Sequence, residues 1–340
     1  RSVEDFNLLK EKVFLKSWQW IGTEDQVPFE GHVNPFILLD GFLTEPMMVS
    51  KDQSGNISCL TNVCTHRGNI VVRTPGKCRN LVCDYHGRRF NLQGEFEFMP
   101  EFDKAEEFPR PCDNLHSFPV RQWGPFLFAG LNPSFDFQVV IDKMNERIGF
   151  LPLNEFVHES SLSREYLVNA HWALYCDNYL EGFHIPFVHH DLNAALDYGS
   201  YTTELYPYMS LQIGYADDDV EVFDLPEGHP DYGKKVAAYY YWVFPNMMFN
   251  FYPWGLSVNI VKPLAVGKTK VQFLSYIYDS DKIESGAGAL LDKVEREDEF
   301  VVEGVQKGIR SQFYNAGRYS PDREQGVHHF HRMLCDFMQK

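Results

Sequence analysis

Two short segments each combine a cysteine and a histidine with a following glycine: Cys-Thr-His-Arg-Gly at residues 64–68 and Cys-Asp-Tyr-His-Gly at residues 83–87. A shared metal centre requires a fold that holds these two loops face to face. Structural zinc sites usually take both cysteines from one element and both histidines from another. In a [2Fe-2S] cluster with mixed ligands, two cysteines hold one iron and two histidines hold the other. We therefore predict such a cluster, with a zinc site or four unrelated core residues as alternatives, on Cys64, His66, Cys83 and His86.

The pattern of predicted secondary structure changes near residue 132. Before it, short strand-like runs alternate with Gly, Pro and Asn, which predicts a small all-β domain over residues 17–132. After it the segments lengthen, which predicts an α+β domain over residues 133–340, with residues 1–16 packed on that domain. Its candidate strands are 165–168, 239–244, 256–261 and 271–278, and its candidate helices are 172–183 and 289–313.

A second group of metal ligands is predicted near Pro186. On a regular helix Glu181 and His184 share a face, but His184 and His189 point about 140° apart. Because proline removes a backbone donor and clashes with the preceding turn, the helix should kink or end at Pro186 and bring His189 back toward His184. An ordinary packing pair of histidines is the alternative, and His190 is an alternative ligand. We interpret His171 as a core residue or one that supports the ligands.

The helix over residues 289–313 supplies a carboxylate for the same site. Its apolar residues form one stripe, and Asp298 falls near the centre of that stripe, whereas Glu297 lies toward the edge and Glu303 points to the solvent side. A carboxylate within a buried stripe is costly unless it is paired or binds a metal. Two histidines and one carboxylate are the ligands of non-haem Fe(II) oxygenases, so we predict iron on His184, His189 and Asp298. A buried ion pair, or Glu297 as the ligand, remains open.

The amino-acid composition limits which partners and which cellular compartment we expect for this chain. The chain has 31 Lys and Arg against 47 Asp and Glu, a net charge of −16, so we expect no nucleic-acid or membrane partner. No apolar run approaches the roughly 20 residues that span a bilayer. Seven cysteines, an odd number, favour a reducing compartment, and Cys59 and Cys78 are interpreted as buried thiols. The chain begins at Arg1 with no apolar leader segment, and we expect a cytoplasmic protein by default.

The spacing Cys-x-His-x16-Cys-x2-His, with Arg-Gly after the first His, resembles the Rieske iron-sulfur motif. Residues 177–189, 240–246 and 297–308 resemble the catalytic domain of Rieske non-haem iron oxygenase α subunits, so the similarity covers nearly the whole chain. The resemblance implies a Rieske domain followed by a helix-grip, START-like catalytic domain with an antiparallel sheet. One departure is Arg88, where these oxygenases commonly have Trp, which alters either the local packing or the docking surface for an electron donor.

The resemblance also implies how such a chain works. It predicts a head-to-tail homotrimer in which His86 faces the partner subunit's His184 across Glu181, with Asp177 and Asn178 as further candidate catalytic residues. Because the chain has no dinucleotide-binding fingerprint, a separate flavin and iron-sulfur reductase should bring electrons from NAD(P)H to the cluster. Fe(II) and dioxygen would then hydroxylate a bound small molecule.

The sequence of residues 177–186 contains Asp-Asn-Tyr-Leu-Glu-Gly and then His-Ile-Pro. It resembles the corresponding segment of the family members that act on choline, glycine betaine or carnitine. It predicts hydroxylation or N-demethylation of a small N-methylated compound. The aromatic residues between 239 and 254 offer a cation–π cage for a trimethylammonium group, although alternating strand residues that fill a β core are an equally good interpretation. An aromatic-ring-hydroxylating dioxygenase and a Rieske electron-transfer protein without oxygenase activity are the alternatives.

Overall fold

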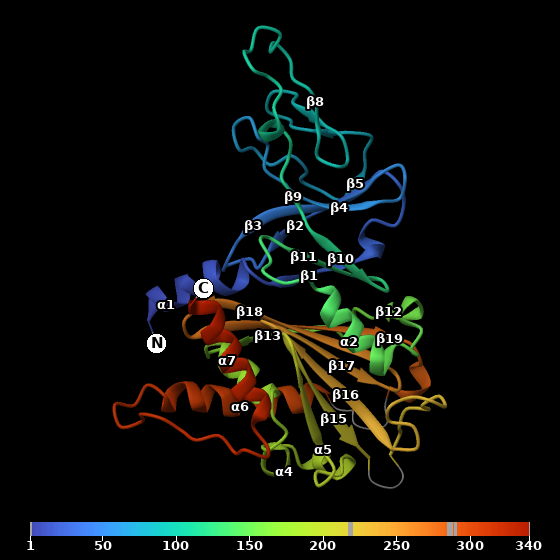
Figure 1. Ribbon diagram of the computed structural model, residues 1–340, viewed down its shortest axis with the longest axis vertical. Coiled ribbons are helices and arrows are strands. Elements are labelled where there is room, and N and C mark those ends of the chain that lie inside the picture. The colour runs from blue at the N-terminus through green and yellow to red at the C-terminus, as the bar shows by residue number, and fades with distance from the viewer. Residues whose placement is uncertain (1, 217–219, 284–287, 289–290, 340) are drawn as a thin grey trace. The chain divides into compact units, whose positions relative to one another are not determined.

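The computed structural model describes residues 2–216, 220–283, 288 and 291–339. The chain divides into two compact units, one formed by residues 15–135 and the other by residues 1–14 together with 136–340 (Figure 1). Among the described residues, no helix has both the length and the apolar character that a membrane span needs.

The unit of residues 15–135 is built from antiparallel strands, as its short strand-like runs predict. A three-stranded sheet has the order β1 (Trp18–Thr23), β11 (Phe126–Gly130) and β10 (Val120–Trp123). A five-stranded sheet has the order β5 (Gly76–Lys77), β2 (His32–Leu38), β3 (Glu45–Lys51), β4 (Ile57–Thr61) and β9 (Ser117–Phe118). A small sheet has the order β6 (Leu81–Val82), β7 (Arg89–Phe90) and β8 (Phe96–Phe98). The core that they enclose includes the thiols of Cys64 and Cys83.

The larger unit contains an eight-stranded antiparallel sheet, which confirms the predicted mixed fold. Its neighbouring strands are, in order, β12 (Val157–His158), β19 (Lys268–Ile277), β18 (Gly255–Ala265), β17 (Met247–Tyr252), β16 (Val236–Val243), β15 (Met209–Tyr215) and β14 (Thr202–Tyr206), and β13 (Arg164–Val168) also pairs with β19. The helices of this unit are α1 (Val3–Leu9), α2 (Gln138–Ile148), α3 (Trp172–Tyr179), α4 (Ile185–Val188), α5 (His190–Ala195), α6 (Leu291–Gly308) and α7 (Gln325–Gln339).

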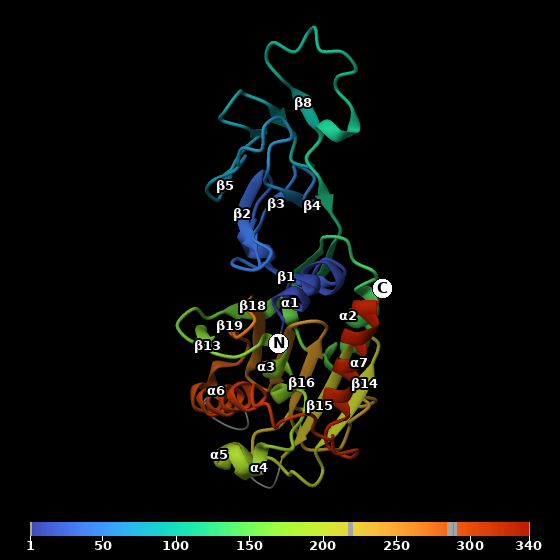
Figure 2. The same ribbon diagram turned by 90° about the vertical axis from the view of Figure 1, so that its left-hand side faces the viewer.

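The two faces of the sheet are covered by different elements. Side chains alternate along β16 because successive residues of a strand point to opposite faces. On one face Trp242 packs against Phe330 of α7, with ring centroids 4.9 Å apart, and α3 contacts α6, α7 and β18 on this side (Figure 2). On the other face the Tyr239 hydroxyl donates to Asp231, which also pairs with Arg147 of α2. Tyr240 is two residues before Trp242 in β16 and therefore lies on the same face. The helices α3, α6 and α7 enclose that face.

Two predicted helices end earlier than the sequence pattern indicated. The first ends at Tyr179 instead of residue 183, and Pro186 lies in the first turn of the new helix α4, where its missing N–H breaks no helical hydrogen bond. The second, α6, ends at Gly308 instead of residue 313, and Phe313 is 88% exposed, so the apolar stripe is buried only in part. The predicted start of this helix at residue 289 lies outside the described residues.

Candidate metal centres and the adjoining cavities

The two Cys/His loops have the same backbone turn. The N–H of Gly68 donates to the carbonyl of Cys64 at 3.0 Å, and the N–H of Gly87 donates to the carbonyl of Cys83 at 3.0 Å. Both glycines have positive φ angles, +74° at Gly68 and +72° at Gly87, which residues with a Cβ adopt only at a cost. The repeated glycine is therefore required by the turn itself.

The four candidate cluster ligands lie in two adjacent pairs. The ring centroids of His66 and His86 are 4.8 Å apart, and the buried thiols of Cys64 and Cys83 interact directly. Burial alone would raise the pKa of the Cys83 thiol, but backbone N–H groups and the side-chain amide of Asn69, 3.6 Å from Sγ, lower that pKa below its ordinary value. Burial raises the pKa of the Cys64 thiol. Two thiols with N–H donors and two imidazoles fit the ligand set of a mixed-ligand [2Fe-2S] cluster.

Arg88, the departure from the family pattern, is an interior residue. Its side chain is 2% exposed, and Nη2 donates to Asp113 Oδ1 at 2.7 Å. The guanidinium carbon also lies 5.7, 5.0 and 5.5 Å from the ring centroids of Phe90, Phe96 and Phe108. Of the two expected consequences, a change in packing is therefore the correct one, because a buried side chain contributes little to a docking surface.

We expect Arg88→Met to lower the local stability of the small unit by about 2–4 kcal/mol, because removing one partner of a buried ion pair leaves the other charge uncompensated. Amide hydrogen exchange of the full chain, resolved to peptides that cover β6 to β8, measures this change. Arg89→Met is the matched control: the Arg89–Glu97 pair at 3.1 Å is exposed, so its loss should cost less than about 1 kcal/mol. Equal protection in the two variants would show that the Arg88 pair adds no stability.

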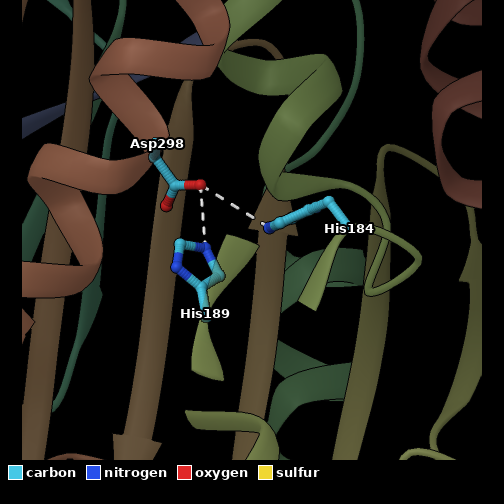
Figure 3. A group of neighbouring side chains, drawn as sticks. All are labelled: His184, His189 and Asp298. Carbon is cyan, nitrogen blue, oxygen red and sulfur yellow. Dashed lines mark hydrogen bonds and ion pairs between the residues drawn. The ribbon is translucent and has the colours of Figure 1, made fainter. Parts of the chain in front are cut away.

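In the larger unit, His184, His189 and Asp298 converge (Figure 3). Oδ1 of Asp298 is 3.0 Å from Nε2 of His189 and 3.5 Å from Nε2 of His184, and one potential ligand atom from each residue lies within 4.8 Å of the others. The two histidines flank the single-turn helix α4, and Asp298 comes from the middle of α6. We call these three residues the ligand cluster. Its two imidazoles and one carboxylate fit the ligand set of a mononuclear non-haem iron.

The far side of each imidazole is held by a carboxylate. Nδ1 of His184 lies 2.7 Å from Oε1 of Glu181, and Nδ1 of His189 lies 2.8 Å from Oε2 of Glu297. A proton shared on Nδ1 leaves the lone pair of Nε2 directed at the shared point, which is the arrangement that orients metal-ligating histidines. Burial alone would lower the pKa of His189, but Asp298 and Glu297 raise it. Glu297 thus contacts the ring nitrogen opposite to the one that faces Asp298.

Of the two further candidates on α3, only Asn178 reaches the ligand cluster. Its Nδ2 donates to Asp298 Oδ1 at 2.6 Å. Asp177, about 100° around the helix, instead accepts a hydrogen bond from His331 of α7 at 2.8 Å, and burial raises its pKa. The structure therefore brings Asn178 into the site and leaves Asp177 at the helix packing interface.

The remaining histidines of this region lie apart from the ligand cluster. Nδ1 of His171 accepts the N–H of Ala173 at 3.3 Å and so caps α3, and burial lowers the His171 pKa to about 4. His190 is exposed at the start of α5. Both positions agree with the expectation that neither is the main ligand.

A cavity opens on the ligand cluster, and we call it the inner cavity. Its aromatic residues are Tyr179, Tyr201, Tyr240 and Tyr252, its apolar residues are Ile185, Leu192, Leu291 and Val294, and its polar residues include Gln212, Asn250, Ser257, Asn259, Glu181 and Glu295. Of the predicted aromatic segment, Tyr240 and Tyr252 face this cavity. Tyr239, Tyr241, Phe249 and Phe251 are buried on the opposite side of the sheet. The strand alternation therefore places Tyr240 and Tyr252 at the cavity, where a cation–π cage would need them, and the other four residues in the β core.

Comparison with known proteins identifies the class. Residues 17–118 match the model of the Rieske [2Fe-2S] domain, and residues 154–340 match the catalytic domain of the ring-hydroxylating alpha subunit. Chloroplastic choline monooxygenase of Beta vulgaris is 30% identical, over 97% of this chain and 73% of the relative. The carnitine monooxygenase oxygenase subunit of Escherichia coli K12 is 24% identical, over 96% and 88%. The structure of the quaternary ammonium Rieske monooxygenase CntA with L-carnitine has a TM-score of 0.76 at 19% identity, over 99% and 93%.

The chain belongs to the ring-hydroxylating alpha-subunit family of Rieske oxygenases. It is an oxidoreductase, the terminal oxygenase component that uses electrons from a separate reductase and dioxygen to hydroxylate a small organic molecule. Its cofactors are a Rieske [2Fe-2S] cluster and a mononuclear iron.

Proposed function

We propose that this oxygenase hydroxylates a C–H bond of a small N-methylated compound, a quaternary ammonium compound, and that the hydroxylation leads to an aldehyde or to N-demethylation. The observation that carries the proposal is the inner cavity, where Tyr201, Tyr240 and Tyr252 surround the space next to the ligand cluster. Aromatic faces attract a trimethylammonium group, which has no N–H to donate. The names of the relatives, choline and carnitine monooxygenases, support the same substrate class.

The proposal assigns the two metal centres to named residues. Residues 17–132 hold the cluster, through Cys64, His66, Cys83 and His86. Residues 133–340 carry out hydroxylation, with iron on His184, His189 and Asp298. This assignment is supported by the two adjacent ligand pairs in the small unit and by the convergence of three ligand atoms in the larger one.

The iron, when bound, supplies the activation of dioxygen for insertion of one oxygen atom into a C–H bond, while the other atom leaves as water with two electrons from NAD(P)H and two protons. The protein orients the ligands through Glu181 and Glu297 at the Nδ1 atoms and through the Asn178 amide at Asp298. Ile185 and Leu192 give the cavity apolar walls, and the tyrosines hold the cationic end of the substrate.

The finer assembly is also part of the proposal. A head-to-tail homotrimer would bring the cluster of one subunit to the iron of the next, with His86 and the partner subunit's His184 linked by Glu181. A flavin and iron-sulfur reductase would deliver the electrons. We place the protein in the cytoplasm, because none of the seven cysteines is paired in a disulfide, which suits a reducing compartment.

The test is oxygen uptake by the loaded enzyme with NADH and a generic reductase, across choline, glycine betaine, carnitine and simple aromatic acids. We expect quaternary ammonium compounds to stimulate uptake and yield a hydroxylated or demethylated product, with about three irons per chain. Stimulation by aromatic acids alone would replace the proposal with an aromatic-ring dioxygenase, and a chain with about two irons and no uptake would indicate electron transfer only.

A further inference from the structure

Arg88 connects the two Cys/His loops of the small unit. Its backbone carbonyl accepts the N–H of Cys83 at 2.8 Å, which closes the second loop. Its Nη2 donates to the backbone carbonyl of Asp113 at 3.0 Å. The same carbonyl oxygen accepts the hydroxyl of Thr65, a residue of the first loop, at 2.8 Å. The Arg88 guanidinium and the first loop therefore share one acceptor.

Aromatic rings surround the guanidinium on the side of the candidate cluster ligands. The ring of Phe108, which contacts Arg88, lies 4.9 Å from the ring of Phe102. Phe102 in turn meets the imidazole of His66 edge-on at 5.6 Å. Because Arg88 is buried among rings, water screens its charge less than it screens a surface charge at the same distance.

The carboxylate of Asp113 cancels this charge only in part. The side chain of Asp113 is 18% exposed, whereas that of Arg88 is 2% exposed, so solvent screens the anion more than the cation. Oδ2 of Asp113 also accepts the backbone N–H of Arg110 at 2.8 Å. The Nε atom of Arg88 is buried and has no hydrogen-bond partner among the described residues. A net positive field therefore remains around the guanidinium.

This field reaches candidate ligands in the first loop. Burial raises the pKa of the Cys64 thiol and lowers the pKa of the His66 imidazole, and the Arg88 charge lowers both pKa values. A positive charge thus acts on a cysteine and a histidine of the predicted cluster from inside the protein.

We propose that Arg88 is a redox-tuning residue, whose buried positive charge raises the reduction potential of the Rieske cluster. One electron from the reductase converts one ferric iron of the cluster to ferrous iron, with no covalent bond formed or broken. The cluster becomes more negative by one charge, and a nearby cation stabilises that form more than the oxidised form. The tryptophan that is common at this position carries no charge, so Arg88 makes this cluster the better electron acceptor. The inference rests on the cluster assignment within the proposed function and is independent of the substrate.

The test is an anaerobic redox titration of the cluster in the full chain at one fixed pH, without reductase or substrate, followed by visible absorption. We expect Arg88→Met to lower the equilibrium constant for one-electron reduction about tenfold, which corresponds to a potential about 59 mV lower. Arg88→Lys keeps the charge but not the planar group, and should stay within about threefold of the wild type.

Asp113→Asn distinguishes charge from packing. It keeps Arg88 and removes the anion that partly cancels it, so the potential should rise, opposite in sign to the change in Arg88→Met. A variant that only loosens the loops would shift the potential in the same direction in both cases.

Arg89→Met is the matched control, because it removes a positive charge from the next residue. Arg89 is 44% exposed and pairs with Glu97, so its loss should change the equilibrium constant less than about twofold. Raising the ionic strength should remove the Arg89 effect and leave the Arg88 effect, since buried charges are screened little by salt.

The outcomes separate charge, packing and cluster assignment. Equal potentials in the wild type and Arg88→Met overturn the inference, and so does an Arg88→Lys enzyme that shifts as far as Arg88→Met. If Arg88→Met fails to hold its cluster, Arg88→Lys and Asp113→Asn decide: a retained potential in the first with a rise in the second supports the inference, and any other pair of results overturns it. A wild-type chain without a Rieske spectrum overturns the cluster assignment and the inference together.

Discussion

Asp298→Ala is expected to remove the mononuclear iron and to leave the Rieske cluster in place. Asp298 supplies the oxygen ligand of the ligand cluster, and its Oδ1 lies 3.0 Å from His189 Nε2. Loss of a group that merely supports a ligand costs about 10–100-fold in affinity or activity, so loss of the ligand itself should lower turnover by more than about 100-fold. Iron should fall from about three to about two per chain, with the visible spectrum of the cluster unchanged.

Two variants on the same helix make this result specific. Glu303→Ala removes a carboxylate that accepts hydrogen bonds from the backbone N–H and side chain of Asn169, away from the cavity, and should keep the iron. Glu297→Ala removes the support of His189 Nδ1 and should weaken iron binding without abolishing it. If Asp298→Ala keeps its iron and Glu297→Ala loses it, Glu297 is the ligand and our assignment is wrong.

The fold class and the clustering of chemistry-bearing residues were predictable because they depend on short-range patterns. The two Cys/His loops carry their own turn glycines, Gly68 and Gly87. Asp298 was identified because a carboxylate in an apolar stripe demands a partner, and the structure brings it to His184 and His189. Both patterns lie within one loop or one helix, where the spacing of residues in the sequence determines where their side chains lie relative to one another.

What the sequence did not reveal depends on contacts between elements. Pro186 was expected to kink or end a helix, but that helix had already ended at Tyr179 and Pro186 lies in the first turn of the next one, which local propensity cannot distinguish. The carboxylate partner of His189 Nδ1 is Glu297, which the helix pattern indicated only as an alternative ligand. The sequence did not identify Glu295 as a residue that lines the inner cavity. Its position one helical turn before Asp298, on the same face of α6, was the available signal.

The same dependence explains Asp177 and Arg88. Asp177 belongs to the segment that resembles the family, yet its carboxylate faces His331, a residue more than 150 positions away in sequence. Arginine is usually exposed, so the residue type alone predicts a surface position for Arg88. Its burial is compensated by the aromatic rings around it and by the ion pair with Asp113. In both cases the decisive partner comes from a distant part of the chain.

Glu181→Gln is expected to keep both metal centres and to lose coupled turnover by more than about 100-fold. The Glu181 carboxylate accepts the Nδ1 proton of His184 and the backbone N–H groups of Phe183 and His184. If it also links to the cluster of a neighbouring subunit, as we propose, an amide in its place offers one acceptor instead of two and carries no charge. Electron transfer between the centres should then be slow while iron binding persists.

Glu297→Gln is the natural control, because Glu297 holds the Nδ1 atom of His189 as Glu181 holds that of His184, at 2.8 and 2.7 Å. The measurement is reoxidation of the pre-reduced cluster by dioxygen with substrate bound, followed by visible absorption in iron-quantified samples. Glu297→Gln should stay within about 100-fold of the wild-type rate, since it disturbs only the support of a ligand. Glu181→Gln should be slower by at least a further factor of about ten, and equal rates in the two variants would reject the link and reduce Glu181 to a support for His184.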